Sequence, residues 1–192
     1  MTVLILGLLV FLGVHSTRII AKDWRADQIQ RHGEGAWKSV YSLLSLAGLG
    51  LISWGYSLAR QEPTLLWTPP VGMRHATGLL TLIAFILLVA GYVPRNTIKS
   101  AVHHPVALAG LVWAFAHLLA NGKLASTVLF GAFLVWASIC FVAARKRDRI
   151  THTRYPAGSA GATALSVAVG AAAWAGFTFW LHGALIGVRP FG

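Results

Sequence analysis

The chain has 192 residues, of which 56% are hydrophobic and only 11% are charged, and its mean hydropathy is +0.67. A soluble domain carries about 25% charged residues, so this chain has too few charges to cover a soluble globule. The composition therefore predicts an integral membrane protein. The 16 lysines and arginines against 5 acidic residues give a net charge of +11. Such an excess is typical either of nucleic-acid binding or of basic membrane loops.

The single cysteine, Cys140, lies in an apolar run. One cysteine excludes an intrachain disulfide, a Cys-x-x-Cys-His haem attachment and any multi-cysteine zinc or iron–sulfur site. The N-terminus has no basic n-region and no small-residue cleavage site after its apolar run. We therefore interpret it as a retained first helix and not as a removed signal peptide.

Six apolar segments are close to the length of about 20 residues that a helix needs to cross the bilayer core. The expected fold is all-α, a polytopic helix bundle that forms one transmembrane domain over residues 1–192. The predicted spans cover residues 2–20, 40–58, 76–93, 105–120, 124–144 and 160–181. Pro105 suits the first turn of the fourth span, and Asn121-Gly122 ends it. The fourth and fifth spans are therefore expected to form a tight antiparallel hairpin.

Six alternating crossings place the loops on two sides. The loops 18–38, 94–103 and 145–159 carry 12 positive residues, and the other side carries 4. The positive-inside rule then puts the first side in the cytoplasm, so that both termini face outward. Membrane insertion explains the basic excess, so no nucleic-acid partner is expected.

Two further patterns lie near the span ends. Trp24 and Trp37 are expected at the membrane interface, as in an aromatic belt, and loop 18–38 is compatible with an amphipathic helix along the cytoplasmic surface. Gly183 and Gly187 form a GxxxG pair, a spacing that permits close helix packing and leaves a homo-oligomer open.

The acidic residues are all predicted to lie in loops: Asp23, Asp27, Glu34, Glu62 and Asp148. A proton-coupled transporter normally needs a carboxylate inside the membrane, so this function class is disfavoured. Histidine is the ionisable residue that remains at depth, because His15 and His117 lie within spans. Such a histidine has one of two explanations. It has a functional role, or its neutral ring forms a hydrogen bond to a neighbouring helix.

The fourth span carries a stripe of small residues that leads to a histidine. Gly110, Ala114 and His117 share one helical face, because they are spaced four and three residues apart. This stripe either forms a groove for a flat ligand that His117 approaches, or lets another helix pack closely.

Two histidines on separate helices, without thiolates or carboxylates at depth, suit haem b better than zinc. Zinc normally takes four ligands, whereas haem iron takes one or two axial ligands from the protein. Arg18 follows His15 by one turn. Together with Arg95 and Lys99 it is expected on the cytoplasmic side, where it would pair with haem propionates.

Several short motifs occur in order along the chain: FLGVHSTR at 11–18, WKSVYSL at 37–43, LWTPP at 66–70, GYVP at 91–94, HHP at 103–105, WAFAHLLANG at 113–122 and LFGAF at 129–133. Together they resemble the NnrU family of proteins of the bacterial inner membrane. The resemblance covers about residues 1–140. It implies a role in denitrification, in which such proteins support the reduction of nitric oxide and nitrite.

The NnrU family is in turn similar to plant-type 15-cis-zeta-carotene isomerase, a membrane enzyme that contains haem b. Haem ligation in that isomerase involves a histidine in a His-Ser motif and another in a Trp-x-x-Ala-His motif. Carried over, these positions fall on His15 and His117. The isomerase also has a ligand-switching cysteine three residues before the second histidine, and this chain has Ala114 there, which argues against that switch.

Depth along the helices gives a different pairing. With a rise of 1.5 Å per residue, His15 lies about 20 Å from the outer boundary and His117 about 20 Å from the inner one. In a core of about 30 Å, the two then differ in depth by about 10 Å. Depth alone would pair His15 with His103 or His104, whereas the resemblance and the small-residue stripe favour His117, which we prefer.

Three functions are therefore carried forward. The first is a haem b-binding NnrU-type protein that acts as a redox or accessory factor beside the denitrification enzymes. The second is a haem-dependent isomerase or oxidoreductase with a hydrophobic substrate dissolved in the lipid bilayer. The third is an assembly or scaffold protein without a cofactor, in which both buried histidines are structural.

Overall fold

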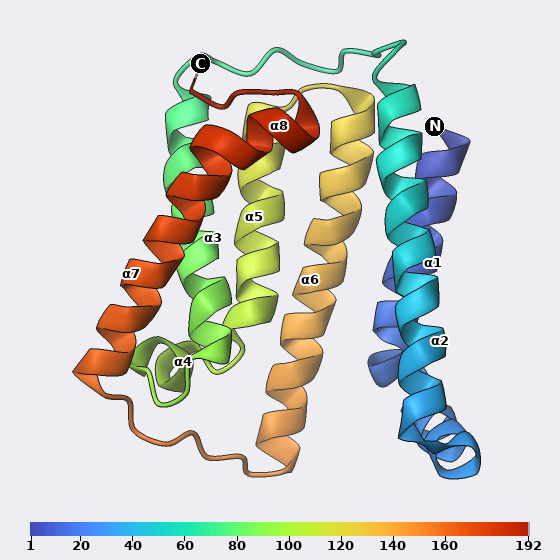
Figure 1. Cartoon of the computed structure of the whole chain (residues 1–192), viewed down its shortest axis with the longest axis vertical. Helices are drawn as coiled ribbons and strands as arrows, with labels where there is room; N and C mark the ends of the chain where they lie inside the picture. Colours follow the sequence, from blue (N-terminus) through green and yellow to red (C-terminus); the bar gives the residue numbers. More distant parts are fainter. Residues whose placement is uncertain (192) are drawn as a thin grey trace. The chain divides into compact units, whose positions relative to one another are not determined.

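The structure, a computed structural model, describes residues 1–191. Its helices are α1 (Thr2–Ile20), α2 (Lys22–Ala59), α3 (Met73–Tyr92), α4 (Thr97–Val102), α5 (Pro105–Ala120), α6 (Leu124–Ile150), α7 (Ala160–Gly176), the π-helical segment η1 (Phe177–Leu181) and α8 (His182–Ile186), as labelled in Figure 1. Within the described range, the only extended pairings are two isolated bridges. The predicted all-α fold class is confirmed.

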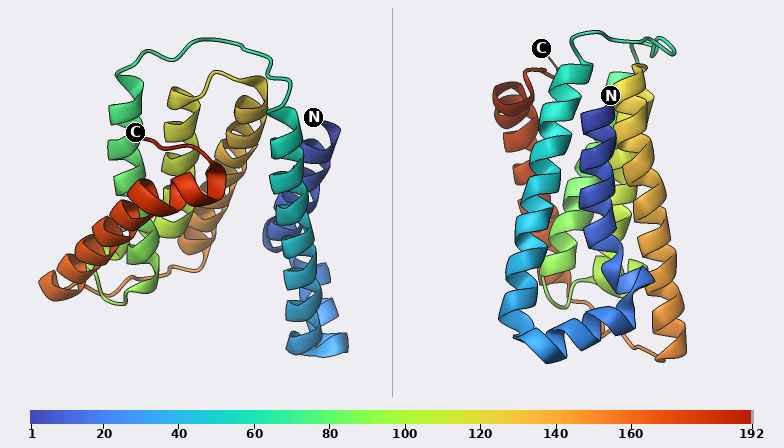
Figure 2. Two further views of the ribbon diagram at one scale, coloured as in Figure 1. Left: turned by 45° about the horizontal axis from the view of Figure 1, so that its top comes forward. Right: turned by 90° about the vertical axis from the view of Figure 1, so that its right-hand side faces the viewer.

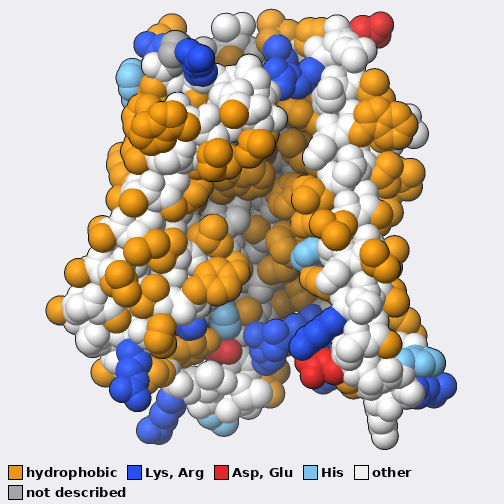
Figure 3. Space-filling view, viewed as in Figure 1, with side chains coloured by type: hydrophobic (Ala, Val, Ile, Leu, Met, Phe, Trp, Pro, Cys, Tyr) orange, Lys and Arg blue, Asp and Glu red, His pale blue; other side chains and the backbone are white. Residues whose placement is uncertain are grey.

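Five helical runs are long and apolar enough to cross a membrane: Thr2–Ile20, Lys22–Ala59, Met73–Tyr92, Leu124–Ile150 and Ala160–Ile186. The fourth predicted span corresponds to α5, which is apolar but has only 16 residues. Many large apolar side chains face outward, such as Leu9 at 68% exposure and Leu185 at 70%. Figure 3 shows such side chains over the middle of the helices, with Lys and Arg near the ends. This distribution fits a helical membrane protein.

The prediction that all five acidic residues lie in loops is wrong for four of them. Asp23, Asp27 and Glu34 lie in α2, and Asp148 lies in α6, because both helices continue beyond their apolar spans. In α2 the extension includes ion pairs between residues four apart, Arg31 with Asp27 at 2.8 Å and Lys38 with Glu34 at 3.0 Å. Such pairs support helix outside the apolar region.

The chain forms two compact units. The first contains residues 1–67 and 123–132, so that it holds α1, α2 and the first turns of α6. The second contains residues 68–122 and everything from Phe133 onward. Each unit positions its own candidate residues, and each is described by itself below.

In the first unit, α1 and α2 run antiparallel and approach closely at glycines. A Cβ atom built on Gly55 would lie 2.2 Å from the backbone nitrogen of Leu4, and one on Gly48 would lie 2.8 Å from that of Phe11. Only glycine allows the two backbones to come so near, which is how small residues promote helix association in membranes. This contact fixes the register of α1 against α2.

Helix α2 bends sharply at Gly33, whose φ of 83° and ψ of 157° are not helical. Glycine adopts this conformation readily because it has no Cβ. The bend separates a first segment, which begins at Lys22, from the apolar part of the helix. Figure 2 shows this first segment running across the direction of the later one. The surface helix expected within loop 18–38 is therefore present, as the start of α2.

In the second unit, α3 packs against both α5 and α7. The hydroxyl of Thr77 in α3 donates to the carbonyl of Ala116 in α5 at 2.9 Å. The indole nitrogen of Trp174 in α7 donates to the hydroxyl of Thr81 at 3.1 Å. Polar bonds between helices help to hold membrane bundles together, since lipid offers no other partner. Helix α5, which carries His117, is thereby held by α3.

The close contact between α1 and α2 predicts a stability difference between two glycines of α2. Replacing Gly55 with alanine forces the backbones apart, so we expect a loss of about 1–3 kcal/mol, as for other overpacked sites. Thermal unfolding of the purified chain in lipid nanodiscs, followed by circular dichroism, measures this loss.

The matched control is Gly50→Ala, because a Cβ on Gly50 meets no atom within 4 Å. Alanine also favours helix over glycine, so this variant should be as stable as the wild type or more stable. Equal melting temperatures for the two variants would contradict the assigned register.

Candidate functional site

His15 lies half-buried near the end of α1, and its ring contacts two residues of the first unit, Phe11 and Tyr41. Its Nδ1 atom lies 2.7 Å from the carbonyl oxygen of Phe11, one turn earlier. Its ring stacks on that of Phe11 at 4.2 Å between centroids, and the ring of Tyr41 in α2 lies at 5.2 Å. The side chain is therefore oriented from two helices.

His117 has the same arrangement in the second unit. Its Nδ1 atom lies 2.8 Å from the carbonyl oxygen of Trp113, again one turn earlier, and the two rings are 5.0 Å apart. The carbonyl of His117 accepts a hydrogen bond of 2.8 Å from the side chain of Asn121, the residue that ends α5. Trp113 packs edge-on against Phe133 of α6.

These hydrogen bonds decide which ring nitrogen carries the proton. A carbonyl oxygen only accepts, so Nδ1 is the donor in both histidines. In the neutral ring, Nε2 then carries the lone pair. Histidines that bind metals commonly have this arrangement, in which a carbonyl accepts the proton of the other nitrogen and fixes the ring. In both histidines, Nε2 is therefore the ring nitrogen whose lone pair could bind a metal.

The other predicted residues near these histidines have distinct environments. Arg18 lies in the last turn of α1, three residues beyond His15, and is exposed. Ala114 is fully buried, and a Cβ on Gly110 would lie 3.6 Å from the Cβ of Ala137 in α6. This distance is an ordinary van der Waals contact, so Gly110 lies beside α6 without an unusually close approach, and both alternatives for the small-residue stripe stay predictions.

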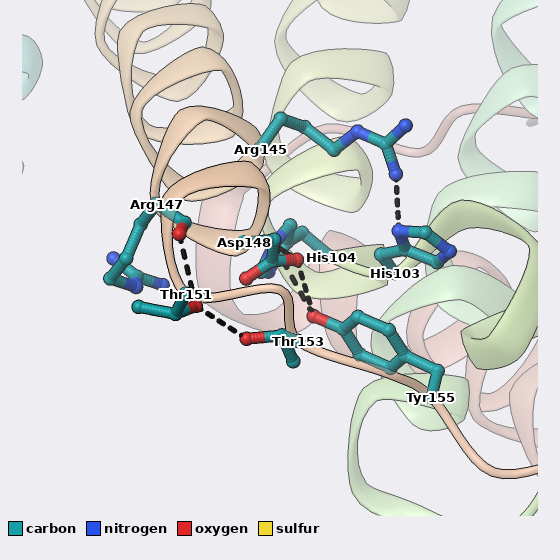
Figure 4. A network of polar contacts seen from close by, with 8 residues as sticks. All are labelled: His103, His104, Arg145, Arg147, Asp148, Thr151, Thr153 and Tyr155. Carbon is teal, nitrogen blue, oxygen red and sulfur yellow. Dashed lines mark hydrogen bonds and ion pairs between the residues drawn. The ribbon is translucent and has the colours of Figure 1, made fainter.

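His104 lies at the opposite end of α5 and belongs to a separate polar network, drawn in Figure 4. Its Nε2 lies 2.7 Å from the carboxylate of Asp148, and that carboxylate also accepts a hydrogen bond of 2.8 Å from Tyr155. Both side chains of the His104–Asp148 pair are largely buried, with 17% and 12% exposed. His104 and His117 are 13 residues apart along the sequence, or about 20 Å at the rise of an α-helix, so one iron could not bind both.

The neighbouring His103 extends this network. Its Nδ1 atom accepts a hydrogen bond from the guanidinium of Arg145, and its ring stacks almost parallel on Tyr155 at 4.3 Å. The backbone of His103 has a φ of 66°, in the left-handed region that non-glycine residues rarely adopt. Burial and the hydrogen bond to Asp148 raise the pKa of Tyr155 to about 12. Tyr155 therefore stays protonated, and a donor, at neutral pH.

Sequence reasoning missed Asp148 and Tyr155 as partners of His104. The two lie 44 and 51 residues further along the chain. No local pattern links them, since the contact arises only when α5, α6 and the segment after α6 come together. In the sequence, Asp148 is a single acidic residue within a basic run, and Tyr155 belongs to a predicted loop.

The described residues do not form a metal site from side chains alone. Within residues 1–191, no three His, Cys, Asp or Glu side chains converge as metal ligands. Two surface hollows lie elsewhere in the second unit. One of about 630 Å³ is lined by Thr97, Ala160, Thr163, Ala164, Val167 and Ala168. The other, of about 210 Å³, is lined by His75, Gly78, Leu79, Leu82, Trp174 and Phe191.

A family model described as NnrU protein matches residues 3–190, nearly the whole chain. The match confirms the resemblance that the sequence motifs indicate, and it includes the part after about residue 150, which those motifs did not cover. No curated protein and no solved structure matches the chain at a significant level.

The network around Asp148 predicts a stability effect at the end of α6. Replacing Asp148 with asparagine removes the charged acceptor for His104 and Tyr155, so we expect a loss of about 1–3 kcal/mol at neutral pH. The melting temperature of the chain in nanodiscs reports this loss. The control is Asp23→Asn, because the Asp23 side chain is 95% exposed and only 4.0 Å from Lys22. A drop that is equally large for Asp23→Asn would show that the network contributes nothing specific.

Proposed function

The chain belongs to the NnrU family, and we propose that it is a haem b-binding protein of the bacterial inner membrane. In this proposal it supports the reduction of nitric oxide or nitrite as a redox or accessory factor. The iron would be held by Nε2 of His15 and of His117. The resemblance in sequence supports the pairing of these two residues, and the local geometry of each supports its role as a ligand.

One observation carries the proposal. His15 and His117 each donate Nδ1–H to a carbonyl of their own helix, at 2.7 and 2.8 Å, and so direct the lone pair to Nε2. A haem supplies four equatorial nitrogens itself, so the protein needs to add only one or two axial ligands. Two imidazoles with the same tautomer meet this requirement.

The donor set also fits the group in chemical terms. Imidazole nitrogen is a common axial ligand of haem iron, whereas a zinc site would need further ligands. Aromatic neighbours hold each ring, namely Phe11 and Tyr41 for His15 and Trp113 for His117. Flat apolar side chains of this kind provide dry surroundings for a porphyrin.

The bound haem would supply one-electron chemistry and a site that recognises a small gas such as nitric oxide. The chain itself would bind and orient the group and keep water away from it. We also place the basic loops in the cytoplasm and both termini in the periplasm, as the distribution of 12 to 4 positive residues suggests.

The scaffold function remains the main alternative, because small residues such as Gly110 and Ala114 also occur where membrane helices pack together without any ligand. The enzyme alternative has less support. Ala114, at the position of the switching cysteine of the isomerase, is fully buried and has no ligating atom. Spectroscopy separates these alternatives.

We expect the full chain, expressed with sufficient haem, to purify with a Soret band and a low-spin bis-histidine spectrum. His15→Ala and His117→Ala should each lose or shift this spectrum, because each removes one axial nitrogen. His104→Ala is the control, since His104 is bonded to Asp148, and it should leave the spectrum unchanged. A chain without a Soret band would favour the scaffold, and an unchanged spectrum in His117→Ala would exclude His117 as a ligand.

The accessory function in nitrogen-oxide reduction predicts a response to nitric oxide. Adding the gas to the reduced protein should shift the Soret band, because nitric oxide would displace one axial histidine. A parallel incubation with a cis-polyene in nanodiscs, analysed by chromatography, should show no isomerisation. Conversion that is lost in His15→Ala would instead establish the isomerase alternative.

A further inference from the structure

The surroundings of His15 continue toward the basic end of the first unit through a series of aromatic rings. Tyr41 lies beside His15 at 5.2 Å, and Trp37 is one turn earlier on the same face of α2. The guanidinium carbon of Arg25 lies 5.6 Å from the centre of the Trp37 ring. Arg25 also interacts electrostatically with Tyr41. Arg25 and His15 thus both lie beside the face of α2 that carries Trp37 and Tyr41.

The bend at Gly33 makes this approach possible. Arg25 and Trp37 lie on opposite sides of the bend, so the chain folds back and lays the guanidinium over the indole. Trp24 adds an edge-on contact to Trp37 at 5.7 Å. A guanidinium that is stacked on an aromatic face loses less freedom when it binds a carboxylate.

The charges in this region are distributed unevenly. Three of its basic residues have a carboxylate neighbour: Lys22 with Asp23 at 4.0 Å, Arg31 with Asp27 at 2.8 Å, and Lys38 with Glu34 at 3.0 Å. No ion pair to a carboxylate is found within residues 1–191 for Arg18 or Arg25. Arg18 and Arg25 are thus two positive charges of this region that no carboxylate of the described residues neutralises.

Arg18 approaches from the other helix. It follows His15 by three residues on α1, so it shares the His15 face and lies about 4.5 Å further toward the basic end. Arg18 on α1 and Arg25 on α2 therefore flank the polar end of the His15 surroundings. Together they offer two positive charges next to a candidate axial ligand.

We propose that Arg25, positioned by Trp37, and Arg18 bind the two propionate groups of the haem that His15 ligates. The proposal rests on the proposed function and adds Arg25 to it, a residue that sequence reasoning did not select. Both propionates leave the same edge of the porphyrin, and their charge requires that edge to face the polar boundary of the membrane. The planar fork of arginine matches a carboxylate with two parallel hydrogen bonds.

The test compares haem with haem dimethyl ester, in which both propionates are esterified and uncharged. The full-length chain is prepared without haem in nanodiscs and titrated with each compound while the Soret band is recorded. The wild type should bind haem roughly tenfold more tightly than the ester, as expected for a charge-assisted hydrogen bond to a partly buried group.

Variants identify the residue responsible. Arg25→Gln should lose most of this preference while keeping the low-spin spectrum, because His15 still ligates the iron. Arg25→Lys keeps the charge and should retain a large part of the preference. Arg31→Gln is the matched control, since it removes one arginine from the same segment but one that already pairs with Asp27. It should behave like the wild type.

Each contrary outcome has its own meaning. An unchanged preference in Arg25→Gln overturns the proposal and leaves haem binding intact. If Arg25→Gln keeps the preference for haem over the ester, but its stability falls below that of the wild type only in nanodiscs with anionic lipid, Arg25 binds lipid headgroups instead. If neither compound gives a Soret band with the wild type, the proposed function fails, and this proposal fails with it.

Discussion

The absence of water from the bilayer core is the constraint on which the rest of this structure depends. Backbone groups at that depth must bond within the chain, which leaves helices as the available form for apolar segments such as these. The same constraint acts on side chains. His15 and His117 both direct Nδ1–H to a carbonyl one turn earlier, so the helix that carries each ring also satisfies it. In this tautomer, Nε2 carries the lone pair of each ring.

A second physical feature, the close approach of α1 and α2, determines what surrounds His15. Gly48 and Gly55 bring the helices so near that no other residue fits at the contact. The resulting antiparallel register sets Tyr41 beside His15, and the bend at Gly33 brings Arg25 back over Trp37. A helix pair held by small residues can therefore arrange one imidazole, its aromatic neighbours and two arginines without any carboxylate inside the membrane.

The second unit separates two kinds of histidine. His117 lies within an apolar helix among aromatic rings, whereas His104 lies at the helix start and bonds to Asp148 and Tyr155. The first kind has the character of a ligand. The second ties the beginning of α5 to the end of α6 and to the segment that follows, so we assign it to structure.

The sequence by itself determined the helical class, the approximate positions of the long apolar helices, and the NnrU family. These follow from composition and from short motifs, which depend on neighbouring residues only. The predicted loop positions of four acidic residues were wrong, because two helices continue beyond the ends of their apolar spans.

Only the tertiary structure decided which residues meet. His104 and Asp148 are 44 positions apart in the sequence, and the intervening segment shows no periodicity that would reveal the hydrogen bond between these two residues. Likewise, the sequence shows Arg25 only as one of the basic residues that set the topology. The bend in α2 is what places its guanidinium over the ring of Trp37. Such contacts depend on helix register and on a single glycine dihedral angle, and neither is encoded in a local pattern of hydrophobicity or charge.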